Sequence, residues 1–485
     1  MSDITPPSKK QRRKQAKARW LVERKAAQRA EGMISSKRKR RNQRQSRATE
    51  SATPSAGVHF TACTSATCDN RLVGNCVIRT IEPYVHRFAQ FVKGRWAGRS
   101  LRELFASEFP TLSADYCVGA AQLGHFRVNG EVADLDKVIT GGDFFEHIKH
   151  RHEPKIHLPV DDSIELSTLK SLSNTWIHEE TDELMVVDKP SGIPVHPTGS
   201  FQLNSLTHML IRDRREALIE ETEALKLFPV HRLDRLTSGL LILAKSADKA
   251  RSLTAELTAT SSEGGIGSRS VQKYYVARVE GKFPDTESGF AGVEGLDSGL
   301  VKIESTNNGF WRVTAPIGLM SPRQGHVRCV LESEDFKPCV TLFRRRGSPV
   351  CGESIVECLL VTGRTHQIRV HLQLLGFPIA NDPMYGPVDE EKAAAFSNQV
   401  VNRVAAAEKS FDIDEFKDED DEHRCILVCE TCTAEKQGTL TIEEDAVLWL
   451  HSYRYESSNW VFEVPLPHWA ALKQCTEVGE VNKAT

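Results

Sequence analysis

The feature that most constrains the fold is a polar turn, residues 231–239, which lies between two apolar runs. Leu227–Val230 and Leu240–Ala244 are short and rich in β-branched or aliphatic residues, which predicts two strands. Asp234 would then lie on a short loop held by a rigid sheet. Catalytic groups are often placed on such loops, but aspartate is also frequent in ordinary turns. The turn alone leaves both a structural and a catalytic role open for Asp234.

Length and composition predict a soluble protein of two or three domains. The chain has 485 residues, of which 40% are hydrophobic and 26% are charged. Its apolar runs are too short to span a membrane, and its first residues lack the apolar core of a secretory signal. We therefore expect the 12 cysteines to be thiols in a reducing compartment.

The charge is distributed unevenly along the chain. Residues 9–47 contain 17 lysines and arginines and two glutamates, which gives this segment a charge of +15. The formal net charge of the whole chain is −2, so the remaining residues carry −17. Such an arm attracts polyanions, and the displaced counterions make its affinity for RNA salt-dependent. A solubilising tail and a nuclear import signal are alternatives, and cytoplasm or mitochondrion stays open as a location. The basic cluster proposed to bind RNA is Lys37, Arg38, Lys39, Arg40 and Arg41.

Four parts are expected along the chain. Changes in composition along the chain, such as the acidic run at residues 412–423, indicate where the larger domain ends and where its insertions lie. The predicted parts are a disordered basic arm (1–55), an extension (56–99), a small module (100–155) and a large domain (177–475) with insertions near 258–270 and 388–423.

The small module has clear local signals. Ser100, followed three residues later by Glu103, predicts a capped helix, and a second helix is expected over 113–123. Asn129-Gly130 predicts a tight turn between two strands. Two short helices followed by small strands resemble the S4-type RNA-binding module, although a purely structural small domain has the same signals.

Two further strings accompany the Asp234 turn. Residues 273–281 (KYYVARVEG) predict a strand ending in a turn. Residues 360–372 (LVTGRTHQIRVHL) predict a strand that leads into a helix, which Gly376 ends. Together with DKPSGIPVHP, HRLDRLTSGLLILAK and TGRTHQIRVHLQLLGFPIANDPMYG, they resemble the RluA-type RNA pseudouridine synthases in family order, over residues 177–386. Residues 94–96 and 150–154 are similar to the eukaryotic branch that modifies tRNA.

The resemblance implies an α+β protein whose catalytic domain has a mixed, mostly antiparallel central sheet. It makes Asp234 the catalytic aspartate and Arg232 the arginine that helps to displace the target base. It makes Tyr275 the residue that packs on the base and Arg369 the basic partner of the aspartate. Without the resemblance, Tyr275 would be an ordinary core aromatic residue and Arg369 a surface charge on a helix.

The chemistry implied is the isomerisation of uridine to pseudouridine. The resemblance to the eukaryotic branch favours a uridine in the anticodon loop of tRNA as the substrate, and rRNA and mRNA stay open. A carboxylate can act as nucleophile or stabilise a positive ribose, and a neighbouring arginine favours its charged form. No cofactor, metal or membrane is needed, and we expect a monomer. A catalytically silent RNA-binding protein is the alternative. Structural zinc is a further possibility for Cys425, Cys429 and Cys432, with His451 or a distant cysteine as a candidate fourth ligand.

Overall fold

The computed structural model consists of two compact units, which are described separately. Among the described residues, the smaller unit contains those within 85–150 and 420–429, and the larger contains those within 56–84, 151–386 and 430–471. The basic arm with Lys37–Arg41, the loop 260–269 and most of the insertion 388–423 lie outside the described residues. The structure describes residues 56–62, 76–109, 112–160, 166–217, 225–259, 270–294, 296, 299–319, 328–329, 337–386, 420–437 and 447–471.

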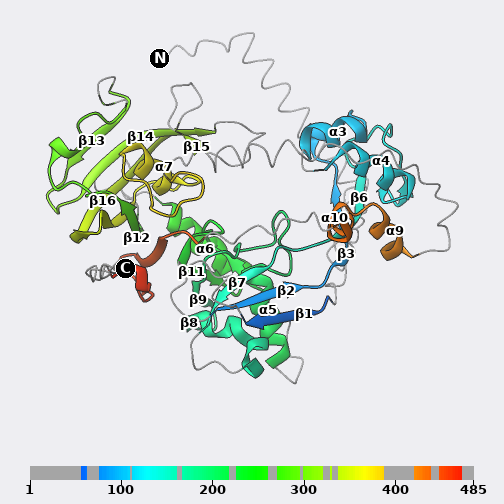
Figure 1. The fold of residues 1–485 in the computed structure, drawn as a ribbon, viewed down its shortest axis with the longest axis horizontal. Helices are drawn as coiled ribbons and strands as arrows, with labels where there is room; N and C mark the ends of the chain where they lie inside the picture. The colour runs from blue at the N-terminus through cyan, green and yellow to red at the C-terminus, as the bar shows by residue number, and fades with distance from the viewer. Residues whose placement is uncertain are drawn as a thin grey trace, which may run out of the picture. The chain divides into compact units, whose positions relative to one another are not determined.

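A large mixed sheet forms the centre of the larger unit (Figure 1). Its strand order is β13-β14-β16-β17-β12-β18-β11-β9-β8, and β10, β15 and β19 pair with β11, β14 and β18. Only the β11–β18 pair is parallel among the described pairs, which confirms the predicted mixed, mostly antiparallel sheet. The strands are β8 (Ile177–Glu180), β9 (Leu184–Lys189), β10 (Phe228–Pro229), β11 (Ser238–Ala244), β12 (Gln272–Glu280), β13 (Lys302–Ser305), β14 (Trp311–Leu319), β15 (Arg328–Cys329), β16 (Lys337–Val350), β17 (Glu353–Leu360), β18 (Leu450–Glu456) and β19 (Val461–Glu463).

The strands on either side of the Asp234 turn form as predicted. β10 lies within the first apolar run, and β11 begins at Ser238, just before the second. Leu240 to Ala244 are fully buried, which explains why this strand is a continuous apolar run rather than an alternating one. The helices of the larger unit are η2 (Leu166–Trp176), α5 (Leu206–Ala217), α6 (Ala247–Thr258), η3 (Glu287–Phe290), α7 (Gln367–Leu374), α10 (Glu430–Gln437) and η5 (His468–Ala470).

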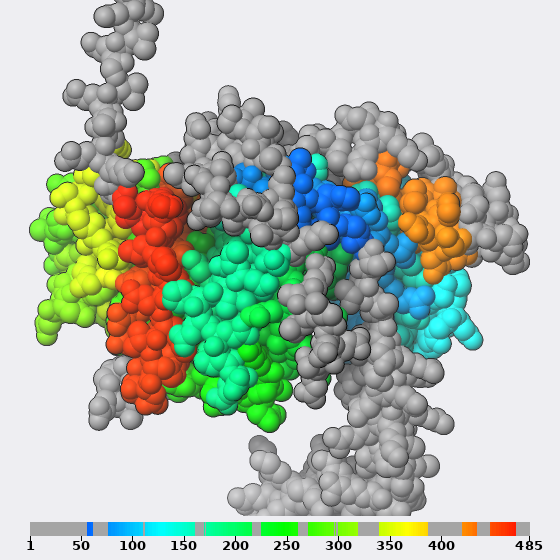
Figure 2. Space-filling view, turned by 90° about the horizontal axis from the view of Figure 1, so that it is seen from below, coloured from blue at the N-terminus to red at the C-terminus, as the bar shows by residue number. Residues whose placement is uncertain are grey.

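β18 comes from the C-terminal part of the chain but lies between β11 and β12. In Figure 2 this C-terminal segment, coloured red, forms a band on the surface between teal and yellow parts of the chain. The close pairing requires a glycine at position 239, which has a φ of 105° and whose added Cβ would overlap the Ser452 carbonyl group. The strand after the Asp234 turn is therefore fixed by a segment more than 200 residues away.

A separate three-stranded sheet lies beside the entry to α5. Its order is β1-β2-β7, formed by Val58–Ala62, Cys76–Ile81 and Ile156–Pro159. Next to β7, the buried Glu153 carboxylate accepts hydrogen bonds from the Tyr84 hydroxyl and from the backbone N–H groups of residues 202–204, at 2.5–3.0 Å. This carboxylate therefore fixes the chain immediately before α5.

The smaller unit combines a four-stranded sheet with two N-terminal helices. Ser100 and Glu103 form the predicted capping box, and Asn129 and Gly130 have the positive φ values of the predicted turn. The sheet order is β3-β6-β4-β5. The elements are β3 (Tyr84–Phe91), η1 (Gly94–Trp96), α3 (Leu101–Glu108), α4 (Ala114–Gln122), β4 (Phe126–Val128), β5 (Glu131–Val132), β6 (Phe144–Arg151) and α9 (Asp421–Leu427).

Helix α9 belongs to the smaller unit although it follows about 270 residues later in the chain. Asp421 lies 3.9 Å from Arg87 and 3.8 Å from Arg127, and Cys425 Sγ lies 3.7 Å from His125 Nε2. The last residues of the acidic insertion therefore begin a packed helix. None of the described helices in either unit is both long and apolar enough to cross a bilayer.

Buried histidines predict a loss of stability in mild acid. Burial lowers the pKa of one of these imidazoles to about 3 and of four others to about 4, whereas an unfolded histidine has a pKa near 6.5. Between pH 6.5 and 4 the unfolded chain therefore binds more protons, so the free energy of unfolding must fall as the pH falls. The five residues are His147, His125, His208, His371 and His451.

We expect the free energy of unfolding, measured in urea, to be at least about 2 kcal/mol lower at pH 5.0 than at pH 7.5. Asp188 opposes this trend, because burial raises its pKa to about 6, but it is one group against five. A free energy that is constant over this range would show that these imidazoles titrate normally in the folded protein.

Candidate active site

The Asp234 turn lines a cavity of about 440 Å³ in the larger unit. The turn, the end of β17, the start of α7 and the strands β12 and β18 together form its wall. The cavity therefore brings together residues from three of the quoted strings: HRLDRLTSGLLILAK, KYYVARVEG and LVTGRTHQIRVHL. Its lining includes Arg232, Asp234, Lys273, Tyr275, His366 and Arg369.

The loop that follows β9 holds the backbone of the Asp234 turn in place. Lys189 Nζ donates to the carbonyl oxygens of Pro190, Ile193 and Arg235 at 2.7, 2.8 and 3.1 Å. The Gly192 N–H also donates to the Arg235 carbonyl, and Ser191 Oγ donates to the Leu236 carbonyl. The two carbonyl groups after Asp234 are thus held by the DKPSG string.

Lys189 is fully buried, and it acts on the turn through its charge as well as through its hydrogen bonds. Burial lowers the pKa of this ammonium group to about 7, and the nearby Asp234 carboxylate opposes that shift. The sequence resemblance included this lysine without assigning it a role. Its place next to the turn depends on the pairing of β9 with β11, which the local sequence does not specify.

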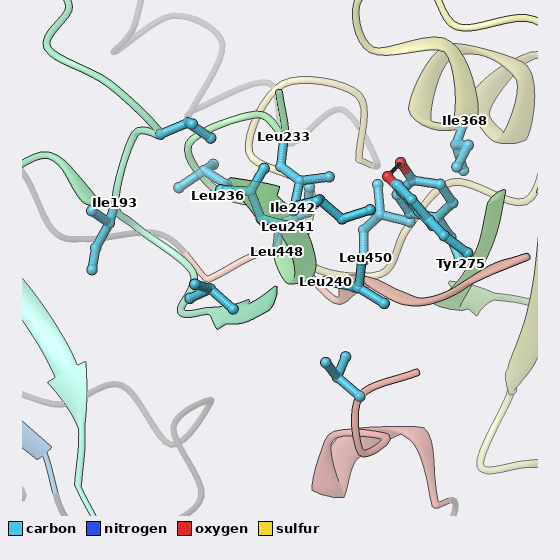
Figure 3. Close-up of a cluster of buried hydrophobic side chains, with 14 of the residues drawn as sticks. Ile193, Leu233, Leu236, Leu240, Leu241, Ile242, Tyr275, Ile368, Leu448 and Leu450 are labelled. Atoms are coloured by element: carbon cyan, nitrogen blue, oxygen red, sulfur yellow. Dashed lines mark hydrogen bonds between the residues drawn. The ribbon is translucent and has the colours of Figure 1, made fainter. Parts of the chain in front are cut away.

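Tyr275 occupies the apolar side of the cavity. It is 6% exposed, and its hydroxyl lies 2.9 Å from the Tyr455 hydroxyl. Burial and the neighbouring Tyr455 raise the pKa of Tyr275 well above its ordinary value, so its hydroxyl stays neutral. Figure 3 shows Tyr275 among the apolar side chains of the turn and β11, with Ile368 approaching from α7.

His231, the first residue of the turn, supports this aromatic pair. Its Nε2 accepts a hydrogen bond from the Ile242 N–H at 3.2 Å, and its Nδ1 lies 3.5 Å from the Tyr455 hydroxyl. Burial, together with Lys273, lowers the pKa of this imidazole well below its ordinary value. His231 is therefore a neutral group that fixes the aromatic wall.

Arg369 lies at the cavity, but its hydrogen bonds go to Asp382. Its Nε and Nη2 donate to the two Asp382 oxygens at 2.6 and 2.7 Å, and both side chains are buried. Burial alone lowers the pKa of this guanidinium, but Asp382 and, more weakly, Asp234 raise it above its ordinary value. The charge of Arg369 thus reaches Asp234, while its geometry is set by Asp382.

Comparison with known proteins connects this site to one family. Residues 183–374 match the RNA pseudouridylate synthase family. RNA pseudouridine synthase 7 of Arabidopsis thaliana is 34% identical over 81% of this chain and 87% of its own length. The chain belongs to the RNA pseudouridylate synthase family.

Two relatives from Saccharomyces cerevisiae are similar over most of the chain. The mitochondrial tRNA pseudouridine(32) synthase is 33% identical over 81% of this chain and 77% of its own length. The tRNA pseudouridine(31) synthase is 32% identical over 81% of this chain and 96% of its own length. The protein is thus an RNA pseudouridine synthase, an isomerase that acts on RNA.

In this pseudouridine synthase, three further residues complete the surroundings of Asp234. Arg232 was predicted from the sequence, whereas His366 and Tyr385 were not. Arg232 is exposed at the cavity, next to the aspartate in the same turn. His366 Nε2 lies 3.6 Å from Asp234 Oδ2, and His366 Nδ1 lies 2.9 Å from the Tyr385 hydroxyl. Both residues belong to the TGRTHQIRVH–ANDPMYG string, where adjacency in sequence does not reveal which side chains face the cavity.

None of the cysteines considered for zinc is among the residues that line the cavity. In the smaller unit Cys425 lies beside His125, and in the larger unit His152 Nε2 lies 3.2 Å from Cys432 Sγ. His451 instead uses its ring nitrogens within the synthase sheet, with Ser238 Oγ at 3.0 Å and the Pro465 carbonyl at 3.1 Å. Both ring nitrogens of His451 thus have partners, one of them Ser238 at the start of β11.

Proposed function

We propose that this enzyme converts a uridine in the anticodon loop of tRNA to pseudouridine, with Asp234 as the catalytic group. The observation that carries the proposal is the position of Asp234, on a clamped loop at a cavity that also contains Tyr275 and Arg369. A cavity of about 440 Å³ falls in the size range of small-molecule sites, so a flipped-out nucleoside can enter it. The two yeast relatives named for tRNA positions support the substrate class.

The isomerisation can be written with the groups at this cavity. The N1–C1′ bond breaks while Asp234 bonds to C1′ or stabilises its positive charge, and the uracil then turns within the cavity. A new bond forms between C5 and C1′, any bond between C1′ and the Asp234 carboxylate breaks to restore the free carboxylate, C5 loses its proton, and N1 gains one. Atoms and electrons balance between substrate and product, so the reaction needs no redox partner or group carrier.

Tyr275 and Arg232 have complementary proposed roles in binding the target base. Extrusion of a base from folded RNA costs a few kcal/mol, and stacking on an aromatic side chain is worth about 1–3 kcal/mol. Tyr275 is rigidly held and apolar on its ring face, which suits it for packing on the uracil. Arg232 is exposed next to Asp234, where it can occupy the space that the base leaves in the RNA.

Parts of the chain outside the cavity would bring the RNA to it. We assign the basic cluster at residues 37–41 to contact with phosphates and the S4-like part of the smaller unit to recognition of RNA shape. The arm is also suited to nuclear import, while one yeast relative is a mitochondrial enzyme. We expect the enzyme to act as a monomer.

The substrate is tested by incubating the purified full chain with unmodified tRNA, rRNA fragments and mRNA transcripts, followed by mapping of pseudouridine at single-nucleotide resolution. We expect a site in the anticodon loop of tRNA and none when Asp234 is replaced by alanine. A variant without residues 1–50 should bind tRNA more weakly, with a shallower salt dependence. Modification of rRNA or mRNA alone would contradict the tRNA assignment, and no modification by the wild type would contradict the catalytic one.

A further inference from the structure

His366 has a backbone conformation that requires an explanation. Three non-glycine residues have positive φ within the described parts of the chain, and Asn129 and Cys351 each precede a glycine in a tight turn. His366 instead stands at the N-cap of α7, with φ 57° and ψ 18°, and makes no capping hydrogen bond. The left-handed region costs a non-glycine residue about 1–2 kcal/mol, and such strain persists mainly where a functional side chain must be held.

The strained backbone places the imidazole between Asp234 and Tyr385. Nε2 lies 3.6 Å from Asp234 Oδ2, Nδ1 lies 2.9 Å from the Tyr385 hydroxyl, and the side chain is only 11% exposed. At 3.6 Å the contact with Asp234 is longer than a hydrogen bond. Hydrogen bonds in catalytic sites are often long without substrate and shorten when it binds.

Tyr385 is itself rigidly fixed. It is 3% exposed, and its N–H donates to Asp382 Oδ1 at 3.0 Å. The guanidinium of Arg369 lies 4.9 Å from the centre of the Tyr385 ring, while its hydrogen bonds go to Asp382. Arg369 and Asp382 therefore act on Asp234 through a chain of contacts that ends at His366.

The hydroxyl of Tyr385 can determine which imidazole nitrogen carries the proton. When this hydroxyl donates to Nδ1, a neutral imidazole has its proton on Nε2, which faces the Asp234 carboxylate. A protonated imidazole presents a donor on both nitrogens, so Asp234 receives a donor in either state. One carboxylate oxygen would then be held, and the other would be left for C1′ of the ribose.

We propose that His366, oriented by Tyr385, is a positioning residue that holds the Asp234 carboxylate in its reactive orientation. This inference rests on the proposed catalytic role of Asp234. His366 is expected to act during cleavage of the glycosidic bond, because that is the step in which the orientation of the Asp234 carboxylate matters. Removal of the C5 proton comes later and does not depend on the contact between His366 and Asp234.

Glycine is the informative replacement for His366, because it removes the imidazole and also adopts the left-handed conformation without strain. We expect His366→Gly to keep or raise the melting temperature and to lower kcat on tRNA at least tenfold, with KM changed less than threefold. Added imidazole should restore part of the lost rate. His366→Gln, which retains an N–H donor, should lie between wild type and His366→Gly, as should Tyr385→Phe.

A substrate carrying 5-fluorouridine at the target site separates positioning from proton transfer, since fluorine cannot leave C5 as a cation and the proton-removal step is absent. Positioning predicts the same loss of rate with uridine and 5-fluorouridine, measured as glycosidic bond rearrangement in a single turnover. Unchanged kcat in His366→Gly, or a loss confined to ordinary uridine, would overturn the inference. Full activity of Asp234→Ala would instead overturn the proposed function on which it rests.

Discussion

Replacement of Asp234 by asparagine is expected to lower the rate of pseudouridine formation at least 10³-fold while leaving tRNA affinity within about threefold of the wild type. Asparagine has nearly the same shape, so the turn and its clamp by Lys189 should be retained. It carries no negative charge, however, and cannot act as nucleophile or counter-charge at C1′. Single-turnover release of tritium from C5-labelled tRNA measures the effect directly.

Two further variants sharpen this test. Asp234→Glu keeps the charge but moves the carboxylate by about one methylene, and a displacement of about 1 Å is expected to reduce the rate about 10²-fold. Asp248→Asn is the matched control, because Asp248 is 85% exposed on α6 and lies outside the residues that line the cavity. An Asp234→Asn enzyme that keeps more than a tenth of the wild-type rate would exclude a covalent or charge-stabilising role for this carboxylate.

Local signals along the sequence predicted much of the fold. The strands around Asp234, the capping box at Ser100, the Asn129-Gly130 turn and the helix that ends before Gly376 all depend on neighbouring residues, so a short window of sequence contains the cause. The family strings added which residues should meet at one cavity. Asp234, Tyr275 and Arg369 do line the same cavity, although they are as much as 135 positions apart in the sequence.

The parts that could not be predicted depend on distant pairings. β18 lies between β11 and β12 because Gly239 lets the Ser452 backbone approach closely, and no local pattern at either position encodes that register. Helix α9 joins the smaller unit through the contact of Cys425 with His125 and the ion pairs of Asp421 with Arg87 and Arg127. Such contacts depend on how separate elements pack, which composition and periodicity do not specify.

Distant packing also explains why Arg369 hydrogen-bonds to Asp382, whereas the sequence predicted Asp234 as its partner. Its place on a helix next to the cavity follows from the sequence, but its hydrogen-bond partner depends on the fold of residues 382–385. Asp382 uses one oxygen for the N–H groups of Met384 and Tyr385 and both oxygens for Arg369. This carboxylate therefore connects the buried cation, the loop and the hydroxyl that contacts His366.

Loss of Asp382 should therefore destabilise the larger unit and slow catalysis together. Arg369 and Asp382 have side chains that are 4% and 0% exposed, so Asp382→Ala leaves a buried guanidinium without its partner. Removal of one member of a buried ion pair costs about 3–5 kcal/mol of unfolding free energy. For a unit of more than 300 residues that corresponds to a fall in melting temperature of roughly 4–8 °C, which calorimetry of the full chain can measure.

The expected loss of unfolding free energy depends on the burial of the Arg369–Asp382 pair. An exposed ion pair tests this dependence. Asp248→Ala removes the partner of Arg251 on α6, where both side chains are more than 75% exposed, and should change the unfolding free energy by less than about 0.5 kcal/mol. A double variant, Arg369→Met with Asp382→Leu, should lose less stability than Asp382→Ala, because no charge is left buried. It should still be slow, since Tyr385 and His366 would lose their support. Equal stability of Asp382→Ala and Asp248→Ala would show that the Arg369–Asp382 pair does not hold this site together.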